Sequence, residues 1–386
     1  MTNNAMSGDS GQSGPVQSPQ DPAGGTDAGT APATTTEATP QHSVRRYLEL
    51  KPLEKLDLPY HNLYENAPSD HRVTLAQFLN NLFTEVEQVD FDKDVKECGT
   101  WTPEGGNIMM PPLDAAENSG AIPVPVSVKK RIKTVYQGRW LARTSFHSDE
   151  HVAFSELGHL LAQDHSRNEV VYTPSVLDSV ELLTWEREDL LKALGDSKYR
   201  HEIHNMQMSI FQMFHMMPKV AGREFLQDRV FHVLVVTTQT KHAESPGELA
   251  RTFTVQLPVD FESFGNGIMA QRSHVKKIGS SRTYQVPQGQ ESCSFKPDVQ
   301  RSRQGRKLTE GKYVAFERLT GAPKKPPSDT GNTGHHRWDM MTVGAAGGVT
   351  RIAPKSVQEK ETMVEIAKDV EYVFTYIAEQ RRKKSG

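Results

Sequence analysis

Alternation of apolar and polar residues predicts a series of β-strands between residues 131 and 343. In the clearest strand, every second position is taken in turn by Met206, Met208, Ile210, Gln212, Phe214 and Met216. A period of two is typical of a strand with one covered face. The same reasoning predicts strands over residues 131–136, 139–146, 169–173, 229–238, 251–257, 312–319 and 337–343.

Spacings of three and four residues between apolar positions predict two well-marked helices. The first covers residues 74–89, where Thr74 and Gln77 are spaced as a capping box. The second closes the chain after a capping box of Ser356 and Glu359. Its apolar stripe is formed by Met363, Ala367, Val370, Phe374 and Ile377. Shorter helices are predicted over residues 151–163 and 186–194.

This order of elements predicts an α+β fold with an antiparallel sheet. Roughly seven to nine strands, interrupted by short helices, precede one long amphipathic helix. If that helix lies across the concave face of a curved sheet, the two enclose either a packed core or a cavity. The residues themselves leave both cases open, and a pocket of roughly 300 Å³ or more would favour a bound ligand.

Composition divides the chain into three parts. Residues 1–43 contain no Leu, Ile, Phe, Tyr, Trp, Lys or Arg, so we expect a disordered, low-complexity tail. Residues 44–125 are expected to form a helical extension followed by an irregular connection rich in Gly, Pro and Asn. Residues 126–386 form the main domain, with a polar insertion at 279–311 that is expected to be mobile because no apolar periodicity holds it to the core.

Charge and cysteine content exclude several classes of function. Net charge is −3, from 45 basic and 48 acidic residues, so we expect no nucleic-acid partner. Cys98 and Cys293 are far apart in polar stretches, which argues against a disulfide framework and a cysteine zinc site. The apolar runs are too short for a spanning helix, and no targeting signal precedes them, so a cytoplasmic protein is expected.

Motifs that resemble catalytic or metal sites fail on spacing. In His201-Glu202-Ile203-His204, the two histidines are three residues apart, whereas a zinc-binding helix needs four. Asp164, His165 and Ser166 are neighbours in sequence, so they cannot form the hydrogen-bonded chain of a hydrolase triad. No phosphate-binding glycine loop is present. We therefore expect no metal, no cofactor and no enzymatic activity.

Several segments, taken together, resemble one known family. They include Trp140-Leu-Ala-Arg143-Thr-Ser-Phe-His147, Asp164 to Pro174, His215-Met-Met-Pro218 and Trp338-Asp-Met-Met-Thr, followed by the closing helix. The chain is similar over roughly residues 74–379 to an uncharacterised fungal family of START-like domains, within the StAR-related lipid-transfer superfamily. The resemblance implies a helix-grip fold, in which a curved antiparallel sheet holds a long C-terminal helix around a tunnel for a lipid or other hydrophobic molecule.

The site expected from this fold is a cavity lined mainly by apolar side chains. The candidate lining residues are Trp140, Arg143, Glu169, Tyr172, Met208, Phe214, Phe231, Trp338, Met363 and Phe374. A buried charge has to pair or meet a ligand head group, and Arg143, Glu169 and Asp339 are the candidates for such a group. The alternative interpretation is an ordinary surface or structural salt bridge.

Three functions remain open at this point. The first is sequestration, sensing or transfer of a hydrophobic ligand. The second is a protein-interaction or scaffold module whose cavity is filled by side chains. The third is an enzyme of the cyclase or hydrolase type, which would need an acid and a base in one cavity, such as His147 with Glu169.

Basic residues gather in three places. These clusters are 129–133, 301–307 and 381–384. Each is a candidate for peripheral contact with anionic lipid head groups. A solvated face or tail is the alternative, because no aromatic residues are interleaved with them.

Overall fold

The structure of the chain is a computed structural model, and the residues described all belong to the unit Val44–Gly386. They are residues 46–65, 72–113, 120–135, 138–195, 197–217, 227–240, 249–287, 296–321, 335–345 and 355–384. The tail expected over residues 1–43 lies outside them. Within the described part of the chain, no helix is long and apolar enough to cross a membrane.

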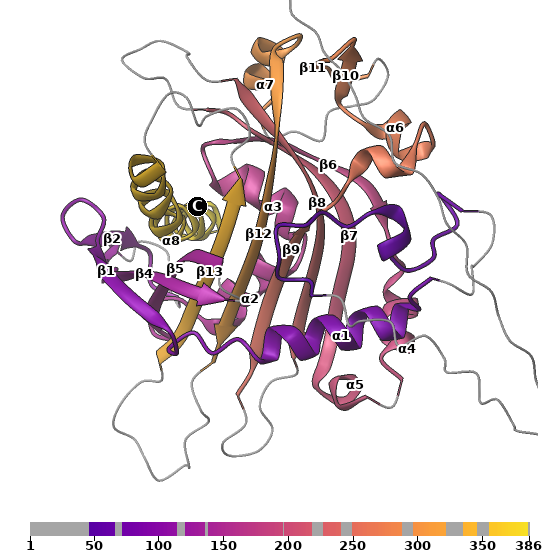
Figure 1. Ribbon diagram of the computed structural model, residues 1–386. Helices are drawn as coiled ribbons and strands as arrows, with labels where there is room; N and C mark the ends of the chain where they lie inside the picture. The colour runs from indigo at the N-terminus through magenta and orange to yellow at the C-terminus, as the bar shows by residue number, and fades with distance from the viewer. Residues whose placement is uncertain are drawn as a thin grey trace, which may run out of the picture. The chain divides into compact units, whose positions relative to one another are not determined.

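A large curved sheet forms the centre of the fold (Figure 1). Its strands are β1 (Val95–Trp101), β4 (Val128–Val135), β5 (Gly138–Ser148), β6 (Val176–Thr184), β7 (Ile203–His215), β8 (Asp228–Thr240), β9 (Arg251–Pro258), β10 (Val275–Ile278), β11 (Ser281–Tyr284), β12 (Lys307–Thr320) and β13 (His335–Ala345). Their order is β1-β4-β5-β13-β12-β9-β8-β7-β6, and the β10–β11 hairpin joins the sheet through β12. Neighbours along this order are antiparallel, whereas the start of β12 also pairs in parallel with the start of β8.

The remaining elements are helices and one small sheet. The α-helices are α1 (Leu75–Glu87), α2 (Phe154–Ala162), α3 (His165–Tyr172), α4 (Arg187–Ala193), α5 (Lys198–Glu202), α6 (Ile268–Arg272), α7 (Pro297–Arg303) and α8 (Lys355–Lys384). Two short 3₁₀ helices are η1 (Lys55–Asp57) and η2 (Phe261–Phe264). The small sheet pairs β2 (Asn107–Met110) with β3 (Ile122–Pro125).

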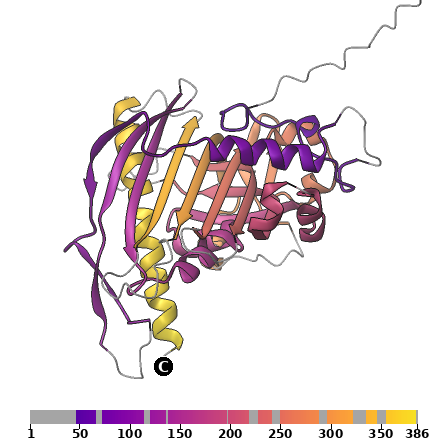
Figure 2. The same cartoon turned by 90° about the horizontal axis from the view of Figure 1, so that it is seen from below.

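One face of the sheet packs against α2, α3 and α8, and we call it the α8 face. Leu319 and Trp338 on the sheet join Leu161 of α2 and Val370 and Phe374 of α8 in one apolar cluster. The sheet bends around α8 on the side of β1, β4 and β5 (Figure 2). This arrangement confirms the predicted α+β fold with a curved antiparallel sheet, and it is consistent with a helix grip.

The opposite face is covered by α1, and we call it the α1 face. Phe78, Leu82 and Phe83 of α1 are fully buried in a cluster that contains Val255 and Phe316 of the sheet. The capping box predicted for this helix is present, because Thr74 accepts from the Gln77 amide and Gln77 from the Thr74 amide. Both faces of the sheet therefore lie under helices (Figure 2).

One predicted strand is wrong. Residues 169–173 lie mainly in helix α3, which ends at Tyr172. β-Branched Val170 and Val171 favour a strand by propensity, but tertiary contacts decide the outcome. The Asn168 side chain donates to the carbonyls of Leu160 and Gln163, which ties α3 to the end of α2.

The described residues of the polar segment 279–311, which lie on both sides of residues 288–295, make specific contacts with the core. Its described residues include β11, α7 and the start of β12. Tyr284 is buried and donates to Asp178, while Arg303 of α7 binds Asp228 of β8. Single aromatic and charged anchors of this kind leave no periodic apolar pattern in the sequence, so these contacts could not be predicted from it.

The expected irregular connection over residues 99–125 also contains regular structure. Strands β2 and β3 pair within it, although their sequence is rich in proline and glycine. Met110 and Val124 are buried in the same cluster as the stripe of α8. This small sheet therefore extends the covering of α8 beyond the main sheet.

Candidate functional site

A buried arginine occupies the middle of the α8 face. Arg143 of β5 is 0% exposed, and its guanidinium lies 4.0 Å from the centre of the Trp338 ring. Its Nη2 is 3.9 Å from Oε1 of Glu317, which is an ion-pair distance but too long for a hydrogen bond. Among the described residues, none of its three guanidinium nitrogens has a hydrogen-bond partner. Arg143 therefore has a charge partner but unsatisfied donors.

Two further acidic side chains, one on α3 and one on α8, lie near Glu317 of the sheet. Burial, with repulsion from Glu317 and Asp369, raises the pKa of Glu169 on α3 to about 8. Burial likewise raises the pKa of Asp369 on α8 to about 7, although Arg143 opposes the shift. Burial and like charges both disfavour ionisation, so Glu169 is mostly protonated at neutral pH, and Asp369 ionises close to neutral pH. The sheet, α3 and α8 thus enclose one cluster, which we call the charge cluster: Arg143, Glu169, Glu317 and Asp369.

A chain of polar groups extends the charge cluster along the sheet. His165 Nδ1 lies 2.8 Å from the Leu161 carbonyl, and its Nε2 lies 2.7 Å from Nε2 of Gln256. These partners assign a neutral imidazole that donates through Nδ1 and accepts through Nε2, in agreement with burial lowering the pKa of His165. Tyr313 donates to Oε1 of Gln256. The side chains are therefore fixed in orientation by one another.

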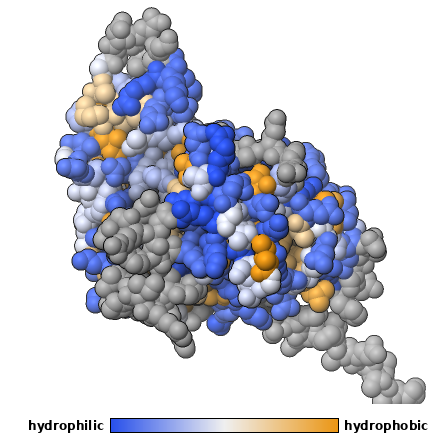
Figure 3. Space-filling model, turned by 90° about the horizontal axis from the view of Figure 1, so that it is seen from above, coloured by the Kyte–Doolittle hydropathy of each residue, from blue (hydrophilic) through white to orange (hydrophobic). Residues whose placement is uncertain are grey.

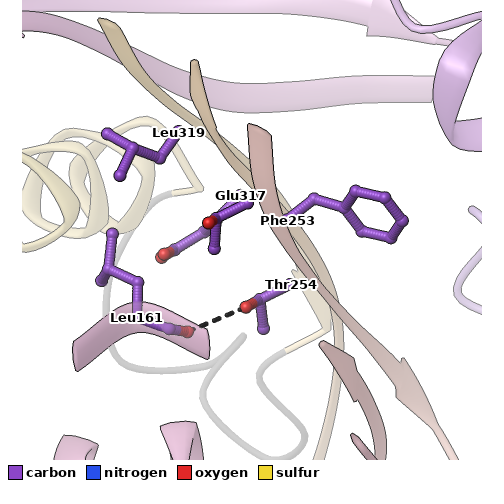
Figure 4. Close-up of a pocket in the computed structure, with 6 residues that line it drawn as sticks. Leu161, Phe253, Thr254, Glu317 and Leu319 are labelled. Carbon is purple, nitrogen blue, oxygen red and sulfur yellow. Dashed lines mark hydrogen bonds between the residues drawn. The ribbon is translucent and has the colours of Figure 1, made fainter. Parts of the chain in front are cut away.

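A hollow lies beside Glu317, between the sheet and α2. It contains about 140 Å³ of space between atoms and has no room for a water-sized sphere. Its lining residues are Leu161, Thr252, Phe253, Thr254, Glu317 and Leu319. Figure 4 shows the Glu317 carboxylate directed between Leu161 and Leu319, whereas the Phe253 ring points to the other side of its strand. In the described residues this gap is filled, and the open cavity expected from the sequence is not present there.

The charge cluster has unused capacity for hydrogen bonding. Atoms that are buried and without a partner include Oε2 of Glu169, Oε2 of Glu317 and Nε1 of Trp338, in addition to the Arg143 nitrogens. Buried polar groups are almost always paired, because an unmet donor or acceptor costs about 1–3 kcal/mol. The cluster can therefore bind a polar group that offers both donors and acceptors.

Seven of the ten candidate lining residues belong to the α8 face or to the helices packed on it. They are Arg143, Glu169, Tyr172, Phe231, Trp338, Met363 and Phe374. Trp140 and Met208 instead belong to the cluster that contains α1, and Phe214 packs with Leu177 and Tyr284. The prediction that these three line the concave side is wrong, because they occupy the alternate positions of their strands.

Asp339 is not part of the charge cluster. It lies on the α1 face, where it is buried and accepts from Arg337 and Thr144, with Arg318 3.5 Å away. Two residues that do belong to the cluster, Glu317 and Asp369, were not predicted. Alternation along β12 places Glu317 on the same side as Leu319, and this signal was available in the sequence.

The pair suggested for acid–base chemistry is not brought together. His147 Nε2 lies 2.8 Å from Ser145 Oγ, and its ring packs against Phe374 and His336. None of the interactions found in the described part of the chain joins it to Glu169. Burial lowers the pKa of His147, with further lowering by the nearby basic groups His336, Arg143 and His335.

Other motifs have structural positions. The two histidines of residues 201–204 are split between α5 and β7, and no group of three or more potential metal ligands occurs in the described residues. Asp164 has a left-handed backbone at the start of α3, where its carbonyl accepts the first helical bonds. Neither motif forms a site.

The basic clusters are largely engaged in internal contacts. Arg131 binds Asp92, and Lys133 donates to the carbonyls of Asp90 and Lys93. In the two later clusters, Arg303 binds Asp228 and Arg381 binds Glu156. Lys383 and Lys384 at the end of α8 are exposed.

Comparison with known proteins identifies one family. The sequence model of a family described as "Protein of unknown function (DUF3074)" matches residues 140–377, which is more than half of the chain. The matched segment runs from β5 to α8 and includes every member of the charge cluster. No curated protein matches the chain.

Proposed function

The chain belongs to the family described as "Protein of unknown function (DUF3074)", and we propose that it binds a lipid or other hydrophobic ligand between the sheet and α8. Binding there would serve to sequester, sense or transfer the ligand in the cytoplasm. The observation that carries the proposal is the full burial of Arg143, none of whose guanidinium nitrogens forms a hydrogen bond among the described residues. A ligand head group that accepts from Arg143 would remove the cost of these unmet donors.

Membership in the START-like superfamily is part of the proposal. The order of elements supports it: strand β5, helices α2 and α3, six successive sheet strands apart from the β10–β11 hairpin, and the long α8. The motifs around Trp140, Asp164 and Trp338 support it independently. Fold alone does not fix function, so the argument for a ligand depends on the charge cluster.

Ligand entry requires part of the interior to open. The hollow beside Glu317 has no space for a water-sized sphere, whereas a pocket for a small ligand has roughly 300 Å³ or more. We propose that α8 moves away from the sheet, because it packs over the charge cluster and carries Asp369. Asp369 would move with it and expose Arg143.

A protein that transfers a lipid between membranes has to contact them. At the C-terminal end of α8, exposed Lys383 and Lys384 lie near the small β2–β3 sheet, where Arg382 donates to the carbonyl of half-exposed Met109. A basic residue near an anionic lipid surface contributes about 1 kcal/mol. This end of the molecule is our candidate for peripheral membrane contact.

Native mass spectrometry of the purified full chain, followed by extraction and lipid analysis, tests the ligand proposal. We expect bound hydrophobic molecules, and a rise in melting temperature with a panel of phospholipids, sterols and fatty acids, because binding only to the folded state stabilises it. Arg143→Met should lower occupancy about tenfold, since a hydrogen bond to a charged group contributes about 1.5–3 kcal/mol. Arg200→Met, at an exposed position on α5, is the matched control.

A ligand-free chain that gains no stability from the panel would sink the proposal. That outcome would favour a protein-interaction module with a filled interior, and the closed hollow beside Glu317 is the observation on its side. The surface of the molecule gives less support to a protein-interaction module. Among the residues coloured in Figure 3, hydrophilic ones predominate and hydrophobic ones form small groups, so the described part of this face offers no broad apolar patch for a partner.

A further inference from the structure

A second polar group lies on the α8 face, near the end of the strands. Val176, His215 and Arg229 are direct neighbours across β6, β7 and β8. Directly opposed residues of antiparallel strands point to the same face. Val176 belongs to an apolar cluster with Val170 of α3, so the row faces the helices that cover the α8 face.

Within the described residues, the charge of Arg229 has no acidic partner. Arg229 is 4% exposed, and its Nε is buried without a hydrogen-bond partner. No ion pair to Arg229 is formed within the described residues, although the neighbouring Asp228 binds Arg303. The Nε2 of His215 is also buried and without a partner. Such an arrangement is costly, because a buried charge is normally paired or coordinated.

The charged groups that influence His215 are both basic. Burial lowers its pKa to about 4, with further lowering by Arg229 and Lys296. Lys296 donates to the carbonyls of Thr173 and Val176, which places its ammonium at the end of α3 next to the row. No carboxylate contributes to the pKa of His215. At neutral pH the neutral imidazole of His215 therefore lies beside the guanidinium of Arg229, and the Lys296 ammonium, whose pKa burial lowers to about 8, lies next to the row.

An apolar wall begins directly beside these groups. The Phe231 ring lies 5.1 Å from the rings of both His215 and Tyr313, measured between centroids. Gly311 allows this placement, because a Cβ there would lie 2.2 Å from Phe231 Cε1. Val233 and Val235 continue the wall along β8, and Tyr313 links it to the charge cluster through Gln256.

We propose that Arg229 and His215 form a binding site for an oxyanion of the phosphate or carboxylate type. This site rests on the proposed function and specifies its ligand as an anionic amphiphile. The head group would bind at Arg229, and the tail would lie along Phe231, Val233 and Val235. The planar guanidinium suits such an oxyanion because it can donate two parallel hydrogen bonds. Nε2 of neutral His215 can donate a third.

Thermal unfolding of the full chain with three soluble probes tests the inference. The probes are inorganic phosphate, hexyl phosphate and hexanol, with sodium chloride at matched ionic strength as the reference. We expect both phosphate probes to raise the melting temperature, with hexyl phosphate acting at a concentration at least about tenfold lower than phosphate because its tail is buried. If inorganic phosphate raises the melting temperature as much as hexyl phosphate does at the same concentration, the occupant is a free anion. The Arg229 site would then stand, and the lipid proposal would be contradicted.

Two substitutions separate binding from structure. Arg229→Met should weaken hexyl phosphate binding about tenfold or more and should raise the melting temperature without a probe, because it removes an unpaired buried charge. Arg229→Lys keeps the charge and should retain most of the binding. Arg251→Met, at an exposed position on β9, is the matched control and should bind normally. The inference is overturned if neither phosphate probe stabilises the chain, or if Arg229→Met binds like the control.

Discussion

At the scale of single residues, the raised pKa of Glu169 makes stability depend on pH. An unfolded glutamate ionises near pH 4.5, whereas the folded pKa of about 8 keeps the carboxyl protonated. Raising the pH between these values ionises the group only in the unfolded chain, so stability falls. At pH 8, Glu169→Gln should therefore have a free energy of unfolding about 2 kcal/mol less diminished than that of the natural chain. This amount includes a reduction for solvent screening, because the side chain is 21% exposed.

Urea unfolding at pH 5 and pH 8 measures this effect. The free energy of unfolding of Glu169→Gln should increase relative to that of the natural chain as the pH rises. Glu188→Gln, at an exposed position on α4, should have the same free energy of unfolding as the natural chain at both pH values. An equal pH dependence in Glu169→Gln and the natural chain would show that Glu169 ionises normally and that the charge cluster is open to solvent.

The residue scale also shows what the sequence could predict. Arg143 and Glu169 were expected to be buried polar groups, and both belong to the charge cluster. Asp339 was expected to join them but lies on the other face, because its direct partner across the strands is Thr144 rather than Arg143. A shift of one position reverses the direction of a side chain in a strand. Pairing register comes from the whole sheet, so this assignment was out of reach of a single segment.

At the scale of elements, strand positions were predictable but their faces were not. Met208 and Phe214 alternate with Phe211 and Met213, and both sets are buried because helices cover both faces of the sheet. Apolar alternation identifies a buried face only when the other face meets water. The sequence left open whether the N-terminal extension belongs to the domain, and α1 of this extension packs directly on the sheet.

Helix α1 should be essential to stability even though it precedes the family match at residue 140. Leu82 is fully buried between α1 and the sheet, so Leu82→Ala should lower the free energy of unfolding by about 3 kcal/mol through lost burial and a cavity. Thr84→Ala, on the exposed side of the same helix, should change it by less than about 0.5 kcal/mol. A loss below 1 kcal/mol for Leu82→Ala, read from urea midpoints, would mean that residues 140–377 fold without α1.

At the scale of the whole molecule, α8 is held unevenly. Its N-terminal part contacts the sheet through a small cluster of Met363, Ile366 and Leu141. Its C-terminal part joins the large cluster of the α8 face, and Arg381 binds Glu156 and the carbonyls of Pro111 and His151. Opening is therefore expected to begin at the N-terminal part, with the C-terminal part as the pivot.

Hydrogen exchange of backbone amides tests this order of opening. Without ligand, amides of residues 360–366 should exchange at least about tenfold faster than those of 373–380, because local opening is easiest where few apolar contacts are lost. Arg381→Met should speed exchange in 373–380 and leave the sheet strands β7 and β8 unchanged. If all of α8 exchanges at one rate, at the level of the sheet, then it opens only when the domain unfolds. A ligand would then have to be enclosed during folding, and transfer between membranes would be ruled out while sequestration would not.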